Sequence, residues 1–441
     1  MKRLMYTELV SWKHSRSRKP LLVQGARQVG KTFLLTEFGK NEYEYIYYLN
    51  FEQNPNLKTL FTEGLSPSKI IDNIGLYFGE KVIAENSLIF FDEIQIVPEA
   101  LTSLKYFYEQ APEYHIVAAG SLLGVSVGKQ SSFPVGKVNF MKIYPMTFYE
   151  YLQASDEKLI ADTLLDMDQI IPLSDLLHEK LMRYFKIYLY VGGMPEVLQD
   201  YLNNGDIASV RQIQNEILEA YKRDFSKYTD KSQAVKTAEL WNSIPYQLAK
   251  ENKKFKYSDV RKGGRSAAFE QTIQWLKGAG LINVAYNISV PKIPLAGYAD
   301  YSKFKIYLLD SGLLGAMLNV ASGIILEPGK IFAEFNGAFI ENAIAAELSI
   351  HNSEHLYYWT SKSDAEVDFI IESRDSIYPL EVKSGTSRNL KSLRSYADKY
   401  KARTICRISP RNFIQDGDFI NIPLYVAFRI KHLLSVMGTD K

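Results

Sequence analysis

A glycine-rich segment near the amino terminus has the residue types of a phosphate-binding loop. Residues 25–32 read GARQVGKT and end in Lys31 and Thr32. A lysine at this spacing reaches the β- and γ-phosphates of a nucleoside triphosphate, and the threonine hydroxyl is a ligand for Mg²⁺. Gly25 and Gly30 are expected to permit tight backbone turns. The predicted nucleotide site consists of Gly25, Ala26, Arg27, Gln28, Val29, Gly30, Lys31, Thr32 and Phe33.

Two adjacent acids follow a second apolar run. The run Leu88 to Phe91 leads directly into Asp92 and Glu93. A buried parallel strand presents such a carboxylate at its carboxyl end, where Asp92 would hold Mg²⁺ beside Thr32. Glu93 would orient or deprotonate the water that attacks the γ-phosphate. This pair favours a hydrolase over a small-molecule kinase.

The nucleotide is predicted to be ATP. A GTPase needs a guanine-reading Asn-Lys-x-Asp element, and the nearest match, Asn252 to Phe255, lacks the acid. Ser121 is a candidate sensor of the γ-phosphate, with a plain turn at the end of a strand as the alternative. Residues 126–136 are expected to form a loop near the γ-phosphate, and Lys137 is its nearby cation.

A second group of acids lies near the carboxyl terminus. Runs at 357–359, 366–371 and 378–383 read as three strands. A hairpin that turns about residues 373–376 puts Asp368 opposite Glu381, with Lys383 on the same face. Two close carboxylates repel each other, so a Mg²⁺ or Mn²⁺ ion is expected between them, and Lys383 would hold a water or stabilise charge.

This set has the pattern of PD-(D/E)XK nucleases. A predicted helix at 331–350 contains Glu341, which would be a further metal-ligating acid. The same hairpin puts Glu366 opposite Lys383, so an ordinary cross-strand ion pair is the alternative for part of the cluster. The pattern predicts a nuclease-like fold and leaves cleavage itself open.

Elements that could position these residues follow from the apolar pattern. Strands are expected at 20–23, 45–50, 115–119 and 138–143, besides the run before Asp92, with helices between them. Such alternation predicts a parallel sheet. From 148 to about 228 the spacing is helical, broken by Val191 to Pro195, and this segment is interpreted as a lid.

Residues 251–290 have the pattern of a winged helix. A short helix at 257–260, a turn at Gly263, a second helix from Ser266 and a strand from Ile282 follow one another. Residues 251–280 hold seven basic side chains (Lys253, Lys254, Lys256, Arg261, Lys262, Arg265, Lys277) and three acidic ones (Glu251, Asp259, Glu270). The excess of positive charge suits contact with DNA phosphates, and a solvated basic face is the alternative.

Composition limits the class of protein. The 441 residues are 46% hydrophobic and 23% charged, with a net charge of +2, which is ordinary for a globular protein of several domains. The single cysteine excludes an internal disulfide framework and favours a reducing interior, so the expected location is cytoplasmic. The amino terminus lacks the apolar core of a secretory signal, and no apolar run approaches the ~18 residues of a membrane span.

Several motifs together resemble a known family. In order they are GARQVGKT, FFDEIQ, AAGSLLG, GGMPEVL, FKIYLLDSGLL, EVDFII and PLEVKSG. Over nearly the whole chain they resemble a large bacterial and archaeal family of AAA-like P-loop ATPases that ends in a domain of unknown function with a restriction-nuclease-like fold. The resemblance implies Gly25, Gly30, Lys31 and Thr32 on phosphate and magnesium, Asp92 and Glu93 in hydrolysis, and Asp368, Glu381 and Lys383 as the nuclease-like set.

One position departs from the family. Its members commonly have Gly-Arg where this chain has Gly136-Lys137, and lysine lacks the bidentate fork of arginine, which argues against a trans-acting finger here. AAA-like ATPases often assemble in rings, so a homo-oligomer is left open.

The predicted architecture is α/β, with four parts. These are a P-loop AAA-like ATPase core (1–147), a helical lid (148–235), a winged-helix module (236–322) and a restriction-nuclease-like α/β domain (323–441). The predicted function is Mg²⁺-dependent ATP hydrolysis that moves the lid and the winged helix relative to the nuclease-like domain and acts on DNA. The alternative is an ATP-driven switch or scaffold whose carboxyl-terminal domain binds a partner or nucleic acid without cutting.

Overall fold

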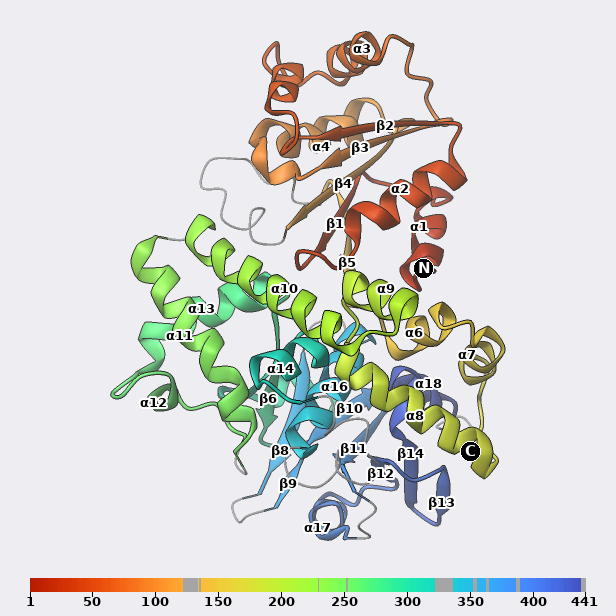
Figure 1. Ribbon diagram of the computed structural model, residues 1–441, viewed down its shortest axis with the longest axis vertical. Coiled ribbons are helices and arrows are strands. Elements are labelled where there is room, and N and C mark those ends of the chain that lie inside the picture. The colour runs from red at the N-terminus through yellow and green to blue at the C-terminus, as the bar shows by residue number, and fades with distance from the viewer. Residues whose placement is uncertain are drawn as a thin grey trace. The chain divides into compact units, whose positions relative to one another are not determined.

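The chain is organised as two compact units, seen in the computed structural model of Figure 1. The structure describes residues 1–121, 134, 136–228, 230–250, 253–321, 336–351, 355–361, 365–385 and 389–437. The smaller unit comprises Lys2–Tyr144 with Gly278–Gly280, and the larger comprises Met1, Pro145–Lys277 and Leu281–Lys441.

The smaller unit is built on a five-stranded parallel sheet in the order β2-β3-β4-β1-β5. The sheet confirms the strands expected from the apolar runs. All six residues of β3 are buried, as expected where helices cover both faces of a parallel sheet. The strands are β1 (Leu21–Gly25), β2 (Tyr45–Asn50), β3 (Ser87–Asp92), β4 (His115–Ser121) and β5 (Asn139–Ile143).

In the described part of the smaller unit, α-helices accompany this sheet, and the first of them precedes β1. They are α1 (Met5–Lys13), α2 (Lys31–Glu42), α3 (Pro67–Phe78) and α4 (Pro98–Gln110). The connection from β1 to β2 passes over the positions that β3 and β4 later fill, and β4 lies between β1 and β3 in the finished sheet. The carboxyl ends of β1 and β3 therefore lie on either side of β4, and a crevice at such a crossover is where α/β sheets bind ligands.

The larger unit begins with helices. They are α6 (Phe148–Ala154), α7 (Lys158–Leu165), α8 (Asp175–Val191), α9 (Pro195–Asn204), α10 (Ile207–Tyr228) and α11 (Lys231–Leu248). Helix α8 ends at Gly192, which has a φ of 77°, and α9 begins after Met194 with Pro195 in its first turn. The glycines and the proline thus separate α8 from α9, as the sequence predicts.

The break between α8 and α9 requires glycine for a second reason. A Cβ on Gly193 would lie 2.1 Å from the carbonyl oxygen of Met146, and a Cβ on Gly192 would lie 2.3 Å from Oδ1 of Asp310. Asp310 accepts hydrogen bonds from the backbone N–H of Gly193 (2.6 Å) and of Leu313 (2.9 Å). Two segments more than a hundred residues apart, GGMPEVL and FKIYLLDSGLL, therefore meet at one buried carboxylate.

The rest of the larger unit contains two sheets. Helices α12 (Tyr257–Val260) and α13 (Ser266–Gly278) precede a four-stranded sheet in the order β7-β6-β8-β9. The second sheet has the order β10-β11-β12-β14-β13. Further described helices of the larger unit are α14 (Ser311–Met317), α16 (Asn336–His351), α17 (Lys391–Tyr400) and α18 (Ile430–Met437). The strands are β6 (Ile282–Ile288), β7 (Ala299–Leu308), β8 (Leu356–Thr360), β9 (Glu366–Val367), β10 (Phe369–Ser373), β11 (Ser376–Val382), β12 (Ile405–Ser409), β13 (Ile414–Asp416) and β14 (Phe419–Pro423).

Strand β6 pairs antiparallel with β7 on one side and parallel with β8 on the other. The hairpin of the predicted winged-helix module and the first strand of the predicted nuclease-like domain thus form one sheet (Figure 1). The four domain boundaries remain predictions.

The predicted hairpin register is confirmed. Strands β10 and β11 pair antiparallel with Phe369 opposite Leu380 and Ser373 opposite Ser376. Extending the register by one residue puts Asp368 opposite Glu381. The expected strand 366–371 is divided at Asp368, because β9 pairs with β8 in one sheet and β10 with β11 in the other. Asp368 therefore lies where the chain passes between the two sheets.

Candidate functional site: a nucleotide loop and a carboxylate cluster

The phosphate-binding loop connects β1 to α2. Its backbone is left-handed at Gln28 (φ 63°) and Gly30 (φ 88°), and α2 begins at Lys31. Gly25 has a different role from the turn that the sequence suggests. It ends β1 in ordinary strand pairing, and a Cβ there would lie 2.4 Å from the carbonyl oxygen of Ile143 on β5. Gly25 is thus required for the close approach of β5, and Gly30 for the turn.

Lys31 is buried at the base of this loop, with 7% of its surface exposed. Its ammonium donates hydrogen bonds to the carbonyl oxygens of Ala26 (2.8 Å) and Gly25 (3.1 Å). Burial lowers the pKa of Lys31 to about 8, against the opposing effect of the nearby Glu93 and Asp92 carboxylates. Phosphate oxygens would replace these carbonyl groups as stronger, charged acceptors.

Thr32 and Asp92 are brought together as predicted from their spacing. The Thr32 hydroxyl donates to Oδ2 of Asp92 at 2.9 Å. Asp92 is 2% exposed and its Oδ1 accepts the backbone N–H of Glu93 at 3.0 Å. A hydroxyl and a carboxylate in contact form a set of oxygen ligands that suits Mg²⁺ with bound waters. These two residues fit the ion that an ATP site needs.

Two residues of β2 that the sequence reading missed complete this site. Tyr48 donates its hydroxyl to Oδ2 of Asp92 at 2.9 Å, and the Asn50 amide donates to the Tyr48 hydroxyl at 3.0 Å. Their place in the site follows from the register of the sheet, in which Asn50 lies opposite Asp92. That register cannot be read from the sequence, because it depends on which strand becomes the neighbour of β3.

Glu93 has a left-handed backbone, with a φ of 53°. This conformation costs a non-glycine residue on the order of 1–3 kcal/mol and is concentrated at functional sites. Its Oε2 accepts a hydrogen bond from the side-chain amide of Gln95. The strained turn directs Glu93 away from the continuation of β3, and Gln95 orients its carboxylate.

Of the remaining predicted residues near the nucleotide, the structure describes some and not others. The backbone of Ser121 lies opposite Gly25 in the β1–β4 pairing, while its side chain lies outside the described residues. Residues 126–133 and 135 of the predicted loop also lie outside them. Lys137 forms an ion pair with Glu109 of α4 at 3.1 Å and lies 5.3 Å from the ring centre of Tyr108. Lys137 is thus held by its own unit.

The carboxyl-terminal acids surround a lysine. Lys305 of β7 is fully buried, and its ammonium lies 2.6 Å from Glu366, 3.0 Å from Glu341 and 3.8 Å from Asp368. The Tyr307 hydroxyl donates to Glu341 at 2.5 Å, and Lys253 pairs with the other oxygen of Glu341. Against the effect of burial, these lysines lower the pKa of Glu341 to about 2. We call Lys253, Lys305, Tyr307, Glu341, Glu366 and Asp368 the lysine–carboxylate cluster.

Asp368 and Glu381 have different partners. Oδ2 of Asp368 accepts the backbone N–H of Val382 at 2.8 Å, and burial, followed by the charge of Glu341, raises the pKa of Asp368 to about 7. Glu381 pairs with Lys383 at 2.5 Å, and its other oxygen, Oε2, has no hydrogen-bond partner among the described residues. In place of the alternative cross-strand pair of Glu366 with Lys383, Glu366 pairs with Lys305 and Lys383 with Glu381.

The predicted metal ligands Glu341, Asp368 and Glu381 have lysine or backbone partners in this arrangement, and their binding of a metal stays a prediction. Across the residues that the structure describes, no three His, Cys, Asp or Glu side chains are placed to share a metal ion. The physical reason is that two lysines already neutralise Glu341, and Lys305 also reaches Glu366 and Asp368. The sequence reading missed Lys305, although a lysine inside the apolar run FKIYLL must find a buried partner.

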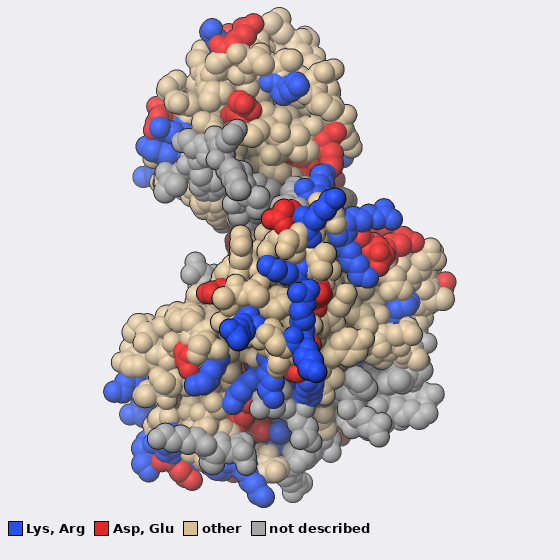
Figure 2. All heavy atoms as spheres, turned by 90° about the vertical axis from the view of Figure 1, so that its left-hand side faces the viewer, with Lys and Arg blue, Asp and Glu red and all other residues tan. Residues whose placement is uncertain are grey.

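The predicted DNA-binding segment forms α12, α13 and the β6–β7 hairpin. Two of its charges pair with α11 and the residues that follow it, Arg261 with Glu239 (2.5 Å) and Asp259 with Lys250 (2.8 Å). Figure 2 faces the side on which α11 to α13 lie in Figure 1, and lysines and arginines gather there on the larger unit. No described helix combines the length and the apolar character needed to cross a membrane.

Comparison with protein families assigns the amino-terminal part. Residues 17–152 match a family described as an AAA domain, residues 182–323 a domain of unknown function (DUF8612), and residues 336–425 another (DUF4143). Residues 17–152 include β1, the phosphate-binding loop and Asp92-Glu93. They form an AAA-type P-loop ATPase domain, which confirms this coarse part of the prediction.

Curated relatives cover a small part of the chain. The uncharacterized proteins Rv2008c of Mycobacterium tuberculosis and Mb2031c of Mycobacterium bovis are each 34% identical over 93 residues. The match covers 21% of this chain, and the chain spans only 20% of the length of those relatives.

Solved structures show lower similarity. The Walker-type ATPase paby2304 of Pyrococcus abyssi has a TM-score of 0.45 and 13% identity, covering 72% of this chain and 95% of that one. The Aeropyrum pernix Orc1 protein in complex with DNA has a TM-score of 0.29 and 12% identity, covering 72% and 90%. At these scores the similarity supports no inference about function.

Proposed function

We propose that the chain is a Mg²⁺-dependent ATPase that hydrolyses ATP at the loop of residues 25–33 and uses nucleotide state to move its larger unit. The observation that carries this proposal is the contact of Thr32 with Asp92, beside a buried Lys31. Lys31 binds the β- and γ-phosphates, and Thr32 and Asp92 hold the ion and its waters. Mg²⁺, when bound, neutralises charge that develops on the phosphates. Ser121 is proposed to contact the γ-phosphate.

Glu93 is proposed to position the attacking water. Its carboxylate is held by Gln95 and follows directly on Asp92, so a water beside the γ-phosphate would lie within reach of it. Replacing Glu93 by glutamine keeps the shape and removes the proton acceptor. General-base catalysis contributes about 10²- to 10⁴-fold, and hydrolysis by Glu93→Gln should fall by that order.

The test measures ATP binding and phosphate release separately. Glu93→Gln should bind ATP as tightly as the wild type while releasing phosphate far more slowly, and Lys31→Ala should lose binding. Glu99→Gln, which changes an exposed glutamate of α4, is the control. Wild-type turnover in Glu93→Gln would remove Glu93 from the mechanism.

For the carboxyl-terminal part we propose the non-cutting alternative, in which it binds nucleic acid or a partner. The buried ammonium of Lys305 supports this proposal because it lies among the acids that a nuclease would use for its metal. A metal-dependent nuclease at Asp368, Glu381 and Lys383 remains the second candidate, supported by the unpartnered oxygen of Glu381.

Plasmid nicking decides between these two. Wild type and Asp368→Ala are compared with Mg²⁺ and with Mn²⁺. The non-cutting proposal expects equal background from both, whereas nicking that is lost in Asp368→Ala supports the nuclease.

DNA contact through α12 and α13 is the third part of the proposal, supported by the exposed basic residues of this segment. Lys262 is exposed, so Lys262→Glu should weaken binding to duplex DNA and reduce its dependence on salt. Arg403→Glu, an exposed change elsewhere in the larger unit, is the control. Stimulation of the ATPase by DNA would connect the two units functionally, and indifference would favour a switch that acts on another partner.

A further inference from the structure

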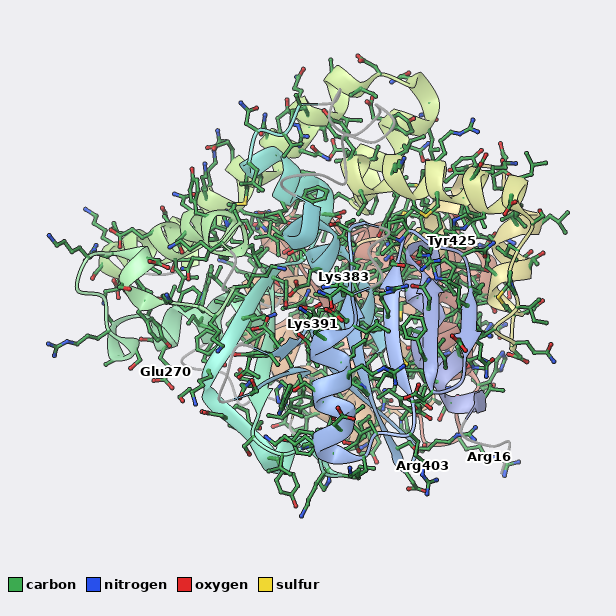
Figure 3. All side chains as sticks on the ribbon, turned by 90° about the horizontal axis from the view of Figure 1, so that it is seen from below. Arg16, Glu270, Lys383, Lys391, Arg403 and Tyr425 are labelled. Atoms are coloured by element: carbon green, nitrogen blue, oxygen red, sulfur yellow. The ribbon has the colours of Figure 1, made fainter. Side chains whose placement is uncertain are left out.

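A groove of about 770 Å³ lies between α13 and the β6–β7 hairpin, with Tyr257 of α12 at its side. Its floor is apolar and aromatic, formed by Val284, Tyr286 and Phe304, each less than 10% exposed. Its rim carries Tyr301, Arg265 and Glu270. We call this the hairpin groove. Figure 3 places Glu270 of the groove well to one side of Lys383.

Aromatic rings dominate the groove. Tyr286 lies with its ring centre 4.8 Å from that of Tyr301 and 6.3 Å from that of Phe304, and Tyr257 lies 6.2 Å from Phe304. Tyr301 is 53% exposed, so its ring is accessible to a ligand. The rings of Tyr257 and Tyr301 thus flank a space that has the size of a binding site for a planar group.

The polar groups at the rim suit a nucleotide. Arg265 is exposed and makes no hydrogen bond or ion pair from its side chain with any residue in the described part of the chain, so its guanidinium is available to a phosphate. Glu270 and Gln274 of α13 line the same groove, and a carboxylate accepts hydrogen bonds from the amino groups of bases. Aromatic faces combined with an arginine are the means by which proteins bind single strands.

We propose that the hairpin groove binds an unpaired nucleotide of a single-stranded nucleic acid, with the base stacked on Tyr301 and the adjacent phosphate on Arg265. The proposal rests on the proposed contact of this segment with DNA and specifies its substrate. The bases of an intact duplex are stacked on one another and cannot enter such a groove. The site therefore prefers single strands or open junctions over uninterrupted duplex.

The first test uses a labelled 12-nucleotide DNA strand that contains 2-aminopurine, without added mononucleotide. The wild type should bind it and quench the 2-aminopurine emission through stacking. Tyr301→Ala should bind about 5- to 150-fold more weakly, the range found when a stacking aromatic is removed. Tyr301→Phe should retain binding. Tyr246→Ala, which removes a tyrosine that is 68% exposed on α11, is the matched control.

Arg265→Gln tests the phosphate contact, with Arg403→Gln as its control. Arg265→Gln should weaken binding and reduce the slope of log affinity against log salt by about 0.7, the value for one phosphate of a single strand. Equal affinity of Tyr301→Ala and Tyr246→Ala for the strand would overturn the proposal. Displacement of the strand by equimolar free mononucleotide would overturn it too, because the site would then belong to a free nucleotide.

A duplex of the same sequence separates this inference from the proposed function. Duplex binding by Tyr301→Ala at the wild-type level, together with loss of the single strand, supports the hairpin groove. A wild type that binds duplex but no single strand overturns the inference and leaves the DNA contact standing. A wild type that binds neither overturns both.

Discussion

His115, the first residue of β4, is a buried titratable residue that contacts α1 of the smaller unit. Its Nδ1 lies 2.7 Å from the Tyr43 hydroxyl, and its ring contacts those of Tyr43 and Trp12 edge to face. Burial, with smaller contributions from the positive charges of Arg18 and Lys13, lowers the pKa of His115 to about 4. The native state thus holds the imidazole neutral, whereas the unfolded chain protonates it near pH 6.5.

We expect this histidine to make the smaller unit sensitive to acid. Above pH 6.5 the imidazole is neutral in both states, so its contribution is complete. As the pH falls from 6.5 to 4 only the unfolded state takes up the proton, and the free energy of unfolding should drop by roughly 3 kcal/mol. In His115→Phe the slope of the free energy of unfolding against pH should fall by the equivalent of one proton. Urea unfolding followed by the fluorescence of Trp12 measures this slope. His14→Gln, which removes an exposed histidine, is the control; a slope unchanged in His115→Phe would contradict the assignment.

Lys305 gives a second prediction at the scale of single residues. Removing one member of a buried ion cluster leaves charges uncompensated, so Lys305→Ala should lower stability by about 3–5 kcal/mol. Glu366 and Asp368 would then lack their lysine, whereas Glu341 would keep Lys253, and Mg²⁺ or Mn²⁺ should raise the melting temperature of Lys305→Ala but not of the wild type. Lys303→Ala, an exposed neighbour on β7, should change stability by no more than about 1 kcal/mol. Absence of a metal effect in Lys305→Ala would mean that the acids do not converge.

Sequence reasoning succeeded for residues whose spacing along the chain fixes their geometry. The loop from Gly25 to Thr32 and the hairpin register of Asp368 with Glu381 are of this kind, because a turn or a tight loop determines them locally. Lys305, Tyr48 and Asn50 were missed because their contacts cross between strands that are distant in sequence. No local rule determines those neighbours.

Among the elements, the break between α8 and α9 has the tightest packing requirement. Gly193 approaches Met146 so closely that Gly193→Ala should force the backbone apart, at a cost of about 1–3 kcal/mol. Gly297 is the matched control, since a Cβ there meets no atom within 4 Å. Thermal unfolding of the two variants measures the difference. Equal melting temperatures would show that the backbone relaxes at no cost.

Element types were predictable where periodicity was strong, as for β3 and α13. The position of Asp368 was not. The sequence reads as one strand from 366 to 371, but β9 and β10 belong to different sheets, and the chain bends between them. Alternation of apolar residues indicates a strand without indicating which sheet each half joins.

For the whole molecule, ligand binding should act on one unit. Trp12 lies in the smaller unit, whereas Trp241, Trp275 and Trp359 lie in the larger. A non-hydrolysable ATP analogue with Mg²⁺ at 100 times its dissociation constant should stabilise the smaller unit by about 2.7 kcal/mol. The part of the fluorescence change that is missing in Trp12→Phe reports on the smaller unit. In the wild type the analogue should move this transition to a higher urea concentration, whereas in Lys31→Ala the transition should not move. A shift in Lys31→Ala equal to that of the wild type would place the analogue elsewhere.

The grouping of the chain into two compact units was not predictable from motifs. The sequence suggests four parts, each with its own pattern. Packing of helices and sheets joins the residues after Pro145 into one unit, because a core is defined by contacts between elements and not by changes in pattern.

The central place of β6 has a mechanical consequence. A hairpin on a flexible linker would swing when a bound strand pulls on it, and little force would reach the rest of the protein. Here β6 is paired along its length with β7 and, over residues 285–288, also with the parallel strand β8. A pull along β6 would load several hydrogen bonds in shear at the same time, so that they would have to break together. Tension on the hairpin would therefore be transmitted to β8 and β9, which would move together with it as one rigid sheet.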